Sequence, residues 1–191
     1  MKKIFILLAA LLLTSHASCK GTNAKDLLAK AQAAEENFEY EKAFSLYQKA
    51  AELGDPEAQC SLARIYDGGF EMEDGIIDYS YVNYDKEFYW YSKAAEQGYA
   101  DGIFGLGSCY LNSKGVERDF AKMRELFELA AQKDSVAALC TLGSWYLGGF
   151  DLYGIPDDPG KAKEYLTRIL QLDNASDDAK NVAKHLLAKI K

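Results

Sequence analysis

The sequence predicts an all-α protein, a right-handed α-solenoid of four helix-turn-helix repeats followed by a C-terminal capping helix. The first observation is a leucine, a small residue and a tyrosine that recur at one internal spacing and end at Tyr66, Tyr110 and Tyr146. The second is a lysine near the start of each second helix, at Lys42, Lys86, Lys122 and Lys161. Intervals of 44 and 36 residues between the tyrosines fit stacked helix pairs, which bury their apolar faces against one another.

The first repeat is expected over residues 24–54. Its first helix, 24–37, is rich in Ala, Leu, Lys and Glu, which favour helix, and its apolar residues fall on one face at helical spacing. Its second helix, 39–53, precedes Gly54, which can take the left-handed conformation that closes a helix.

The second repeat, 55–98, opens on Asp55-Pro56, an N-cap followed by proline at the first helical position. Its helices, 57–66 and 85–97, flank a long loop over 67–84. The pair Ala94-Ala95 allows another helix to approach closely.

The third repeat, 99–134, contains helices over 100–111 and 120–133. The fourth, 135–173, contains helices over 136–147 and 159–172, with Asp158 as the N-cap of the second. A last helix over 177–190, within the cap 176–191, has apolar residues on one face and lysines elsewhere. A helix of this kind can cover the final apolar face of a solenoid.

The third unit carries the fullest repeat pattern. It consists of Leu106-Gly107, Tyr110, Gly115-Val116, Asp119, Lys122 and Ala130-Ala131. This pattern resembles the Sel-one-like repeat, a relative of the tetratricopeptide repeat. The first unit lacks the Leu-Gly motif, and Ile169-Leu170 replaces the alanine pair in the fourth. The resemblance covers about residues 25–173 and implies a helical adaptor without specifying its partner.

The N-terminus predicts export. Lys2-Lys3 precede ten apolar residues, 4–13, which are too few to span a bilayer, so residues 1–18 are expected to be a signal peptide. Cleavage after Ala17 would release a secreted or periplasmic protein. Cleavage before Cys19 would instead resemble lipoprotein processing, with Cys19 lipidated and 19–23 a short linker, although His16 stands where the lipobox has an aliphatic residue. An uncleaved anchor is the third alternative.

Side chains for catalysis are scarce in this sequence. Its two histidines are His16, in the signal segment, and His185, in the capping helix, and no Ser-x-x-Lys sequence occurs. The acidic loop 70–78 lacks the aspartate spacing of an EF-hand. A net charge of −7 disfavours binding to nucleic acid, which is itself negatively charged. We therefore expect no catalytic residue, metal or cofactor.

The three cysteines that would remain after processing each fall on the first helix of a repeat. A disulfide between Cys60 and Cys140 would have to skip a whole repeat, and Cys109 has no partner within its own repeat. We expect buried free thiols.

Two surfaces are candidates for partner binding. The resemblance places the first helices on the concave face, where the residues that vary between repeats are Gln59, Arg64, Phe104, Ser108 and Ser144. Two long loops both open with Gly-Gly-Phe, and their aromatic candidates, with the start of the helix after the first loop, are Phe70, Tyr79, Tyr81, Tyr89, Phe150 and Tyr153. The alternative for these aromatic residues is that they only pack against the repeats.

The expected function is a noncatalytic scaffold of the bacterial cell envelope that binds an unidentified protein or peptide. A hydrolase acting on cell wall or glycan, and a subunit that recognises an envelope polysaccharide, are the alternatives.

Overall fold

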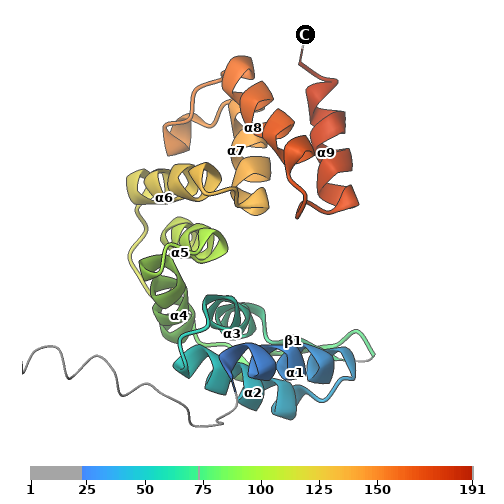
Figure 1. Cartoon of the computed structure of the whole chain (residues 1–191). Coiled ribbons are helices and arrows are strands. Elements are labelled where there is room, and N and C mark those ends of the chain that lie inside the picture. Colours follow the sequence, from blue (N-terminus) through green and yellow to red (C-terminus); the bar gives the residue numbers. More distant parts are fainter. Residues whose placement is uncertain (1–22, 73, 191) are drawn as a thin grey trace, which may run out of the picture.

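The computed structural model describes residues 23–72 and 74–190, and over these residues the protein is a stack of helices (Figure 1). The helices are α1 (Ala24–Glu36), α2 (Tyr40–Glu52), α3 (Pro56–Gly68), α4 (Tyr84–Glu96), α5 (Ala100–Asn112), α6 (Phe120–Gln132), α7 (Val136–Gly148), α8 (Pro159–Gln171) and α9 (Asp177–Leu187).

Successive helices pack against each other along the whole array, and first helices of neighbouring repeats also meet, α3 with α5 and α5 with α7. Figure 1 shows the result as an open arc, with α1–α3 at one end, α6–α9 at the other and α4 and α5 between them. The predicted helical solenoid is confirmed, and α9 packs on α7 and α8 as the cap.

The recurrent lysine marks a helix N-cap. The side-chain oxygens of Asn83, Asp119 and Asp158 each accept a hydrogen bond of 2.9–3.0 Å from the backbone N–H three residues on, which belongs to that lysine. The carboxylate or amide thereby satisfies a backbone donor that has no partner inside the helix. The spacing therefore fixes where α4, α6 and α8 begin.

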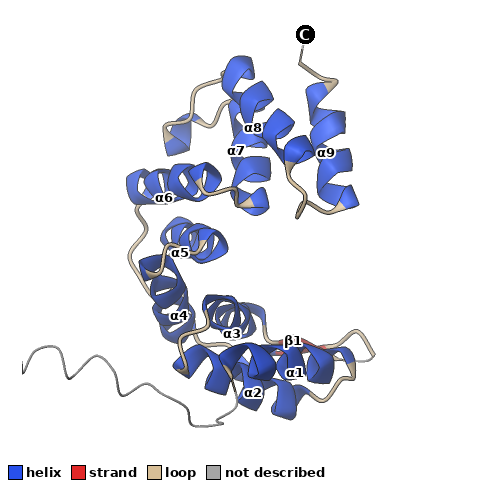
Figure 2. Cartoon of the chain, viewed as in Figure 1, coloured by secondary structure: helices blue, strands red, loops and turns tan. Residues whose placement is uncertain are grey.

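The long loop after α3 contains structure that the sequence did not predict. Strands β1 (Phe70–Glu71) and β2 (Ile77–Asp78) form a small antiparallel hairpin, followed by a 3-10 turn at Tyr79–Tyr81 (Figure 2). Gly69 has a φ of +77°, and a Cβ there would overlap the carbonyl of Asp78. A glycine is required because the chain turns tightly against its own hairpin.

The apolar interior divides into two clusters. One joins α1, α2, α3 and Phe70 of the hairpin, and the other joins α5 to α9. Helix α4 lies between them, and its buried residues are Glu87 and Ala94. The second repeat is therefore where the two apolar cores separate.

The described helices include none that is long and apolar enough to cross a membrane. The predicted signal peptide, its cleavage site and Cys19 lie outside the described residues.

Candidate binding site

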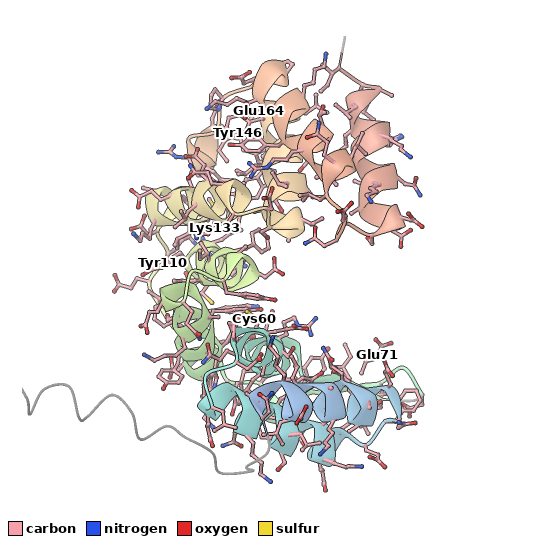
Figure 3. The ribbon with its side chains drawn as sticks, in the orientation of Figure 1. Cys60, Glu71, Tyr110, Lys133, Tyr146 and Glu164 are labelled. Atoms are coloured by element: carbon pink, nitrogen blue, oxygen red, sulfur yellow. The ribbon has the colours of Figure 1, made fainter. Side chains whose placement is uncertain are left out.

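A cavity of about 460 Å³ opens on the inner side of the arc. Helices α3 and α5 form most of its wall, α1, α4 and α7 contribute further residues, and Tyr99 and Lys114 come from the segments that flank α5. Cys60, labelled in Figure 3, lies on the side of α3 that faces α5 and belongs to the lining. The volume is within the range of sites that hold small ligands or the side chains of a partner.

Charged residues surround this cavity. Lys114 makes an ion pair with Asp67, and Asp101 accepts a hydrogen bond of 2.8 Å from Ser135. Glu57 accepts one of 3.1 Å from Gln32 at the other end. These charged side chains of the lining are thus held in place by neighbouring side chains.

Glu87, on α4, lines the cavity although only 2% of its surface is exposed. Its Oε1 lies 3.6 Å from the thiol of Cys109, and its Oε2 has no hydrogen-bond partner among the described residues. Burial and the nearby Asp67 raise the pKa of this carboxyl to about 7, and Lys114 partly opposes that shift. Glu87 is therefore a buried acid that changes charge near neutral pH.

Aromatic rings complete the wall, contributed by Tyr91, Tyr99 and Phe104. Phe104 stacks on Phe127 with the ring centroids 4.5 Å apart. A Cβ at Gly105 would overlap the Tyr91 ring, so the glycine lets that ring approach α5. Burial raises the pKa of Tyr91 far above its ordinary value.

The repeat register shows that Glu87 is unusual. The corresponding residues, each directly after the recurrent lysine, are Ala43, Met123 and Ala162, and all three are fully buried in apolar surroundings. One repeat thus carries a carboxyl group where the other three carry an apolar side chain. Comparing the repeats residue by residue could have identified Glu87 from the sequence.

Three of the five concave-face candidates reach the cavity, namely Arg64, Phe104 and Ser108. Gln59 does not, because it is 4% exposed and its amide is engaged with the Ala51 carbonyl and the Gln97 side chain. Its candidacy is corrected to a packing role. Ser144 lies outside the cavity lining, and its hydroxyl donates to the Thr141 carbonyl.

The first aromatic loop mixes buried and exposed side chains. Phe70 is 2% exposed and packs against the Tyr40 and Tyr81 rings, so it is corrected from a contact candidate to a core residue. Tyr81 also contacts Phe44. Tyr79, by contrast, is 64% exposed.

The remaining aromatic candidates lie apart from the cavity. Tyr89 is exposed and packs its ring against Trp90. Phe150 is exposed and stacks on Tyr153, which also packs against Phe120. Their roles as partner contacts stay predictions.

The prediction of free thiols is confirmed for Cys60, Cys109 and Cys140, and the first two are buried. Burial raises the pKa of the Cys60 thiol to about 12 and shifts that of Cys109 in the same direction. Thiols protonated at neutral pH are poor nucleophiles. These cysteines therefore behave as small apolar residues of the helix interfaces.

The family assignment follows from four matched segments. The model of the family described as Sel1 repeat matches residues 32–55, 56–99, 100–135 and 136–174. The chain belongs to the Sel1 repeat family, and the resemblance inferred from its motifs is confirmed.

Solved structures show the same fold. A Sel1 repeat protein from Oxalobacter formigenes is 22% identical with a TM-score of 0.62, over 76% of this chain and 56% of that one. A putative Sel1 repeat protein from Klebsiella pneumoniae is 26% identical with a TM-score of 0.59, over 88% of this chain and 77% of that one. Cysteine-rich protein B of Helicobacter pylori is 25% identical with a TM-score of 0.51, over 85% of this chain and 98% of that one.

Curated relatives include a plant protein called ERAD-associated E3 ubiquitin-protein ligase component HRD3B, from Arabidopsis thaliana. It is 32% identical over 139 residues, which are 71% of this chain and 22% of the relative. Chitin synthase regulatory factor 3 of Schizosaccharomyces pombe is 30% identical over 131 residues, or 67% of this chain and 13% of the relative. This chain spans about a fifth of the length of the first of these relatives.

Proposed function

We propose that this protein is a noncatalytic scaffold of the bacterial cell envelope, which binds a protein or peptide in the cavity between α3 and α5. The observation that carries the proposal is the cavity itself. First helices of adjacent repeats supply its wall, and the exposed Arg64 and the partly exposed Phe104 and Ser108 lie along it. Sel1 repeats serve as scaffolds for protein–protein interaction, and two relatives are named as a component and a regulatory factor.

The envelope setting rests on residues 1–19. The lysines, the apolar segment and Cys19 together favour export with lipidation. Two acyl chains would hold the protein on a membrane more stably than one.

Affinity capture tests the scaffold. Full-length tagged protein is recovered from solubilised native envelope, and bound proteins are identified by mass spectrometry. Ser108→Arg places a large cation at the cavity wall, and Asn181→Arg makes the same kind of change at an exposed position on α9. A partner retained by wild type and Asn181→Arg but lost by Ser108→Arg supports the proposal. Capture of the same proteins by all three contradicts a cavity site, and no captured protein contradicts the scaffold.

Metabolic labelling with an alkyne fatty acid tests the anchor. Wild type is expected to be labelled and to fractionate with membranes, whereas Cys19→Ser is expected to lose the label. Mass spectrometry that finds an unlabelled mature chain beginning at Ser18 would contradict lipidation and support a periplasmic or secreted form.

A further inference from the structure

We infer that the cavity between α3 and α5 recognises a cationic group, the ammonium of lysine or the guanidinium of arginine, and that Glu87 is the residue that binds its charge. The inference rests on the proposed function in one respect, since the cation is carried by the protein partner. It adds the chemistry that the cavity selects.

The first step is the unsatisfied carboxyl of Glu87 in the cavity lining. Glu87 is 98% buried, its Oε1 accepts one weak hydrogen bond of 3.6 Å from the Cys109 thiol, and its Oε2 has no partner among the described residues. A buried carboxylate with one oxygen unpaired and only a weak thiol donor on the other is strongly disfavoured. An N–H donor with positive charge that enters the cavity would supply both the missing hydrogen bond and the opposite charge.

The second step is the charge around Glu87. Asp67 from α3, Cys109 from α5 and Lys114 from the loop after α5 face it, and the Lys114 ammonium is paired with Asp67. The lining also contains two further acids, Glu57 and Asp101, and one further cation, the exposed Arg64. Four carboxyl groups and two cations leave the lining negative once Glu87 is ionised. An anionic ligand would be repelled, whereas a cation would be attracted.

The third step is the aromatic wall. Rings of Tyr91, Tyr99 and Phe104 lie on the same cavity as these acids. Aromatic faces attract cations through the ring quadrupole, and they also pack against the aliphatic stem of a lysine or arginine. A buried carboxylate and aromatic rings in one cavity therefore match a long side chain with a charged tip.

The fourth step is that stacking does not require this acid. The same register position is Ala43, Met123 and Ala162 in the other repeats, and each packs in an apolar core. Burying a carboxyl group there makes the second repeat less stable than an apolar residue would. A ligand-binding role explains why that position differs.

Cation binding should be coupled to proton release. Burial and Asp67 hold the pKa of Glu87 near 7, so the carboxyl is mostly protonated at pH 6 and mostly ionised at pH 8. A bound cation favours the ionised form and lowers this pKa. Affinity should therefore rise between pH 6 and pH 8.

The test uses small probes in place of the partner. The mature protein is titrated with n-butylammonium, n-butylguanidinium, n-butanol and butyrate, while amide resonances and the Glu87 side-chain carboxyl are followed by NMR. The two cations are expected to shift the amides of Gly105 and Cys109 and to lower the carboxyl pKa. Butanol and butyrate are expected to do neither.

Variants identify the residue responsible. Glu87→Gln keeps the shape and removes the charge, and it should weaken cation binding by about tenfold or more, the loss expected for a hydrogen bond to a charged group. Glu57→Gln, at an exposed position of the same lining, should weaken it by no more than about twofold. Circular dichroism and the melting temperature show that both variants are folded. Three results would each overturn the inference. They are binding of butanol as tight as that of the cations, an affinity for the cations that is unchanged in Glu87→Gln, and a Glu87 pKa that the cations do not shift.

Capture with Glu87→Gln separates this inference from the scaffold proposal. A partner that is lost by both Glu87→Gln and Ser108→Arg supports both. A partner lost only by Ser108→Arg upholds the scaffold and overturns the role of Glu87. If butylammonium binding depends on Glu87 but no protein is captured, the cation site is upheld and the scaffold is overturned. The cation would then come from a free amine.

Discussion

Helices α4 and α6 occupy the same place in consecutive repeats, yet they bury different chemistry. In α6 the inward residues Met123 and Phe127 are fully or almost fully buried in the C-terminal core. Their counterparts in α4 are Glu87 and Tyr91, which line the cavity. Both helices keep a fully buried alanine at the next position of that face, Ala130 and Ala94. The comparison indicates that close helix contact needs the alanine, while the two positions before it can be specialised.

The largest expected contrast between the two helices comes from removing the ring. Phe127→Ala should lower the free energy of unfolding by about 3–5 kcal/mol, because it leaves a cavity in a closed apolar core. Tyr91→Ala should lower it by about half as much, since Tyr91 is only partly buried and already borders a cavity. Urea unfolding followed by circular dichroism measures both changes. Equal losses of unfolding free energy would contradict the difference in packing between α4 and α6.

The next effect concerns the charge of Glu87. Its pKa is raised from 4.5 to about 7 in the folded protein, so the folded state binds the proton more tightly than the unfolded chain. Stability from this group is therefore present below pH 4.5 and is lost as pH rises to about 7, by roughly 3 kcal/mol. Glu87→Gln and Glu87→Met should remove that loss. The free energy of unfolding of each variant should therefore rise relative to that of wild type between pH 5 and pH 8.

The measurement is the difference in unfolding free energy between each variant and wild type at several pH values. Titrating groups that do not interact with Glu87 are common to both proteins and cancel. A difference that does not change with pH would show that Glu87 does not titrate in this range.

A smaller effect is expected at Gly105. Its replacement by alanine would force a Cβ into the Tyr91 ring, and such overpacking lowers stability by about 1–3 kcal/mol. Gly68, in the last turn of α3, is a matched control because a Cβ there meets nothing within 4 Å. Gly68→Ala should be neutral or slightly stabilising. Thermal unfolding of the two variants compares them, and similar melting temperatures would contradict close packing at Gly105.

The smallest effects lie in the first aromatic loop. Tyr81→Ala removes ring contacts with Phe44 and Phe70 and should lower stability by about 1–2 kcal/mol. Tyr79→Ala should change it by less than about 0.5 kcal/mol, because that side chain is mostly exposed. If Tyr79→Ala weakens partner capture without lowering the melting temperature, the loop is part of the binding surface. If Tyr79→Ala instead leaves partner capture unchanged and lowers the melting temperature, the Tyr79 side chain serves packing.

Helix boundaries were predictable because local chemistry sets them. The predicted helix over 100–111 is observed as Ala100–Asn112, and that over 120–133 as Phe120–Gln132. Caps such as Asp119, and the left-handed Gly54 and Gly98, act on the backbone within one turn. The hairpin after α3 was missed because two-residue strands give too short a pattern of alternating residues.

The candidate site was predicted only in part. Variation between repeats selected Arg64, Phe104 and Ser108, which lie on the cavity, and it also selected Gln59, whose side chain is buried. Glu87 was overlooked because a glutamate in the first turn of a helix is ordinary in sequence.

The sequence by itself determined the repeat, its register, the helix ends and the membership of a family, since these depend on local patterns that recur along the chain. Only the tertiary structure decided that Glu87, Lys114 and Asp67 meet with the aromatic rings at one cavity. Those groups come from different helices and a loop, and their burial and charge coupling exist only once α3, α4 and α5 have packed.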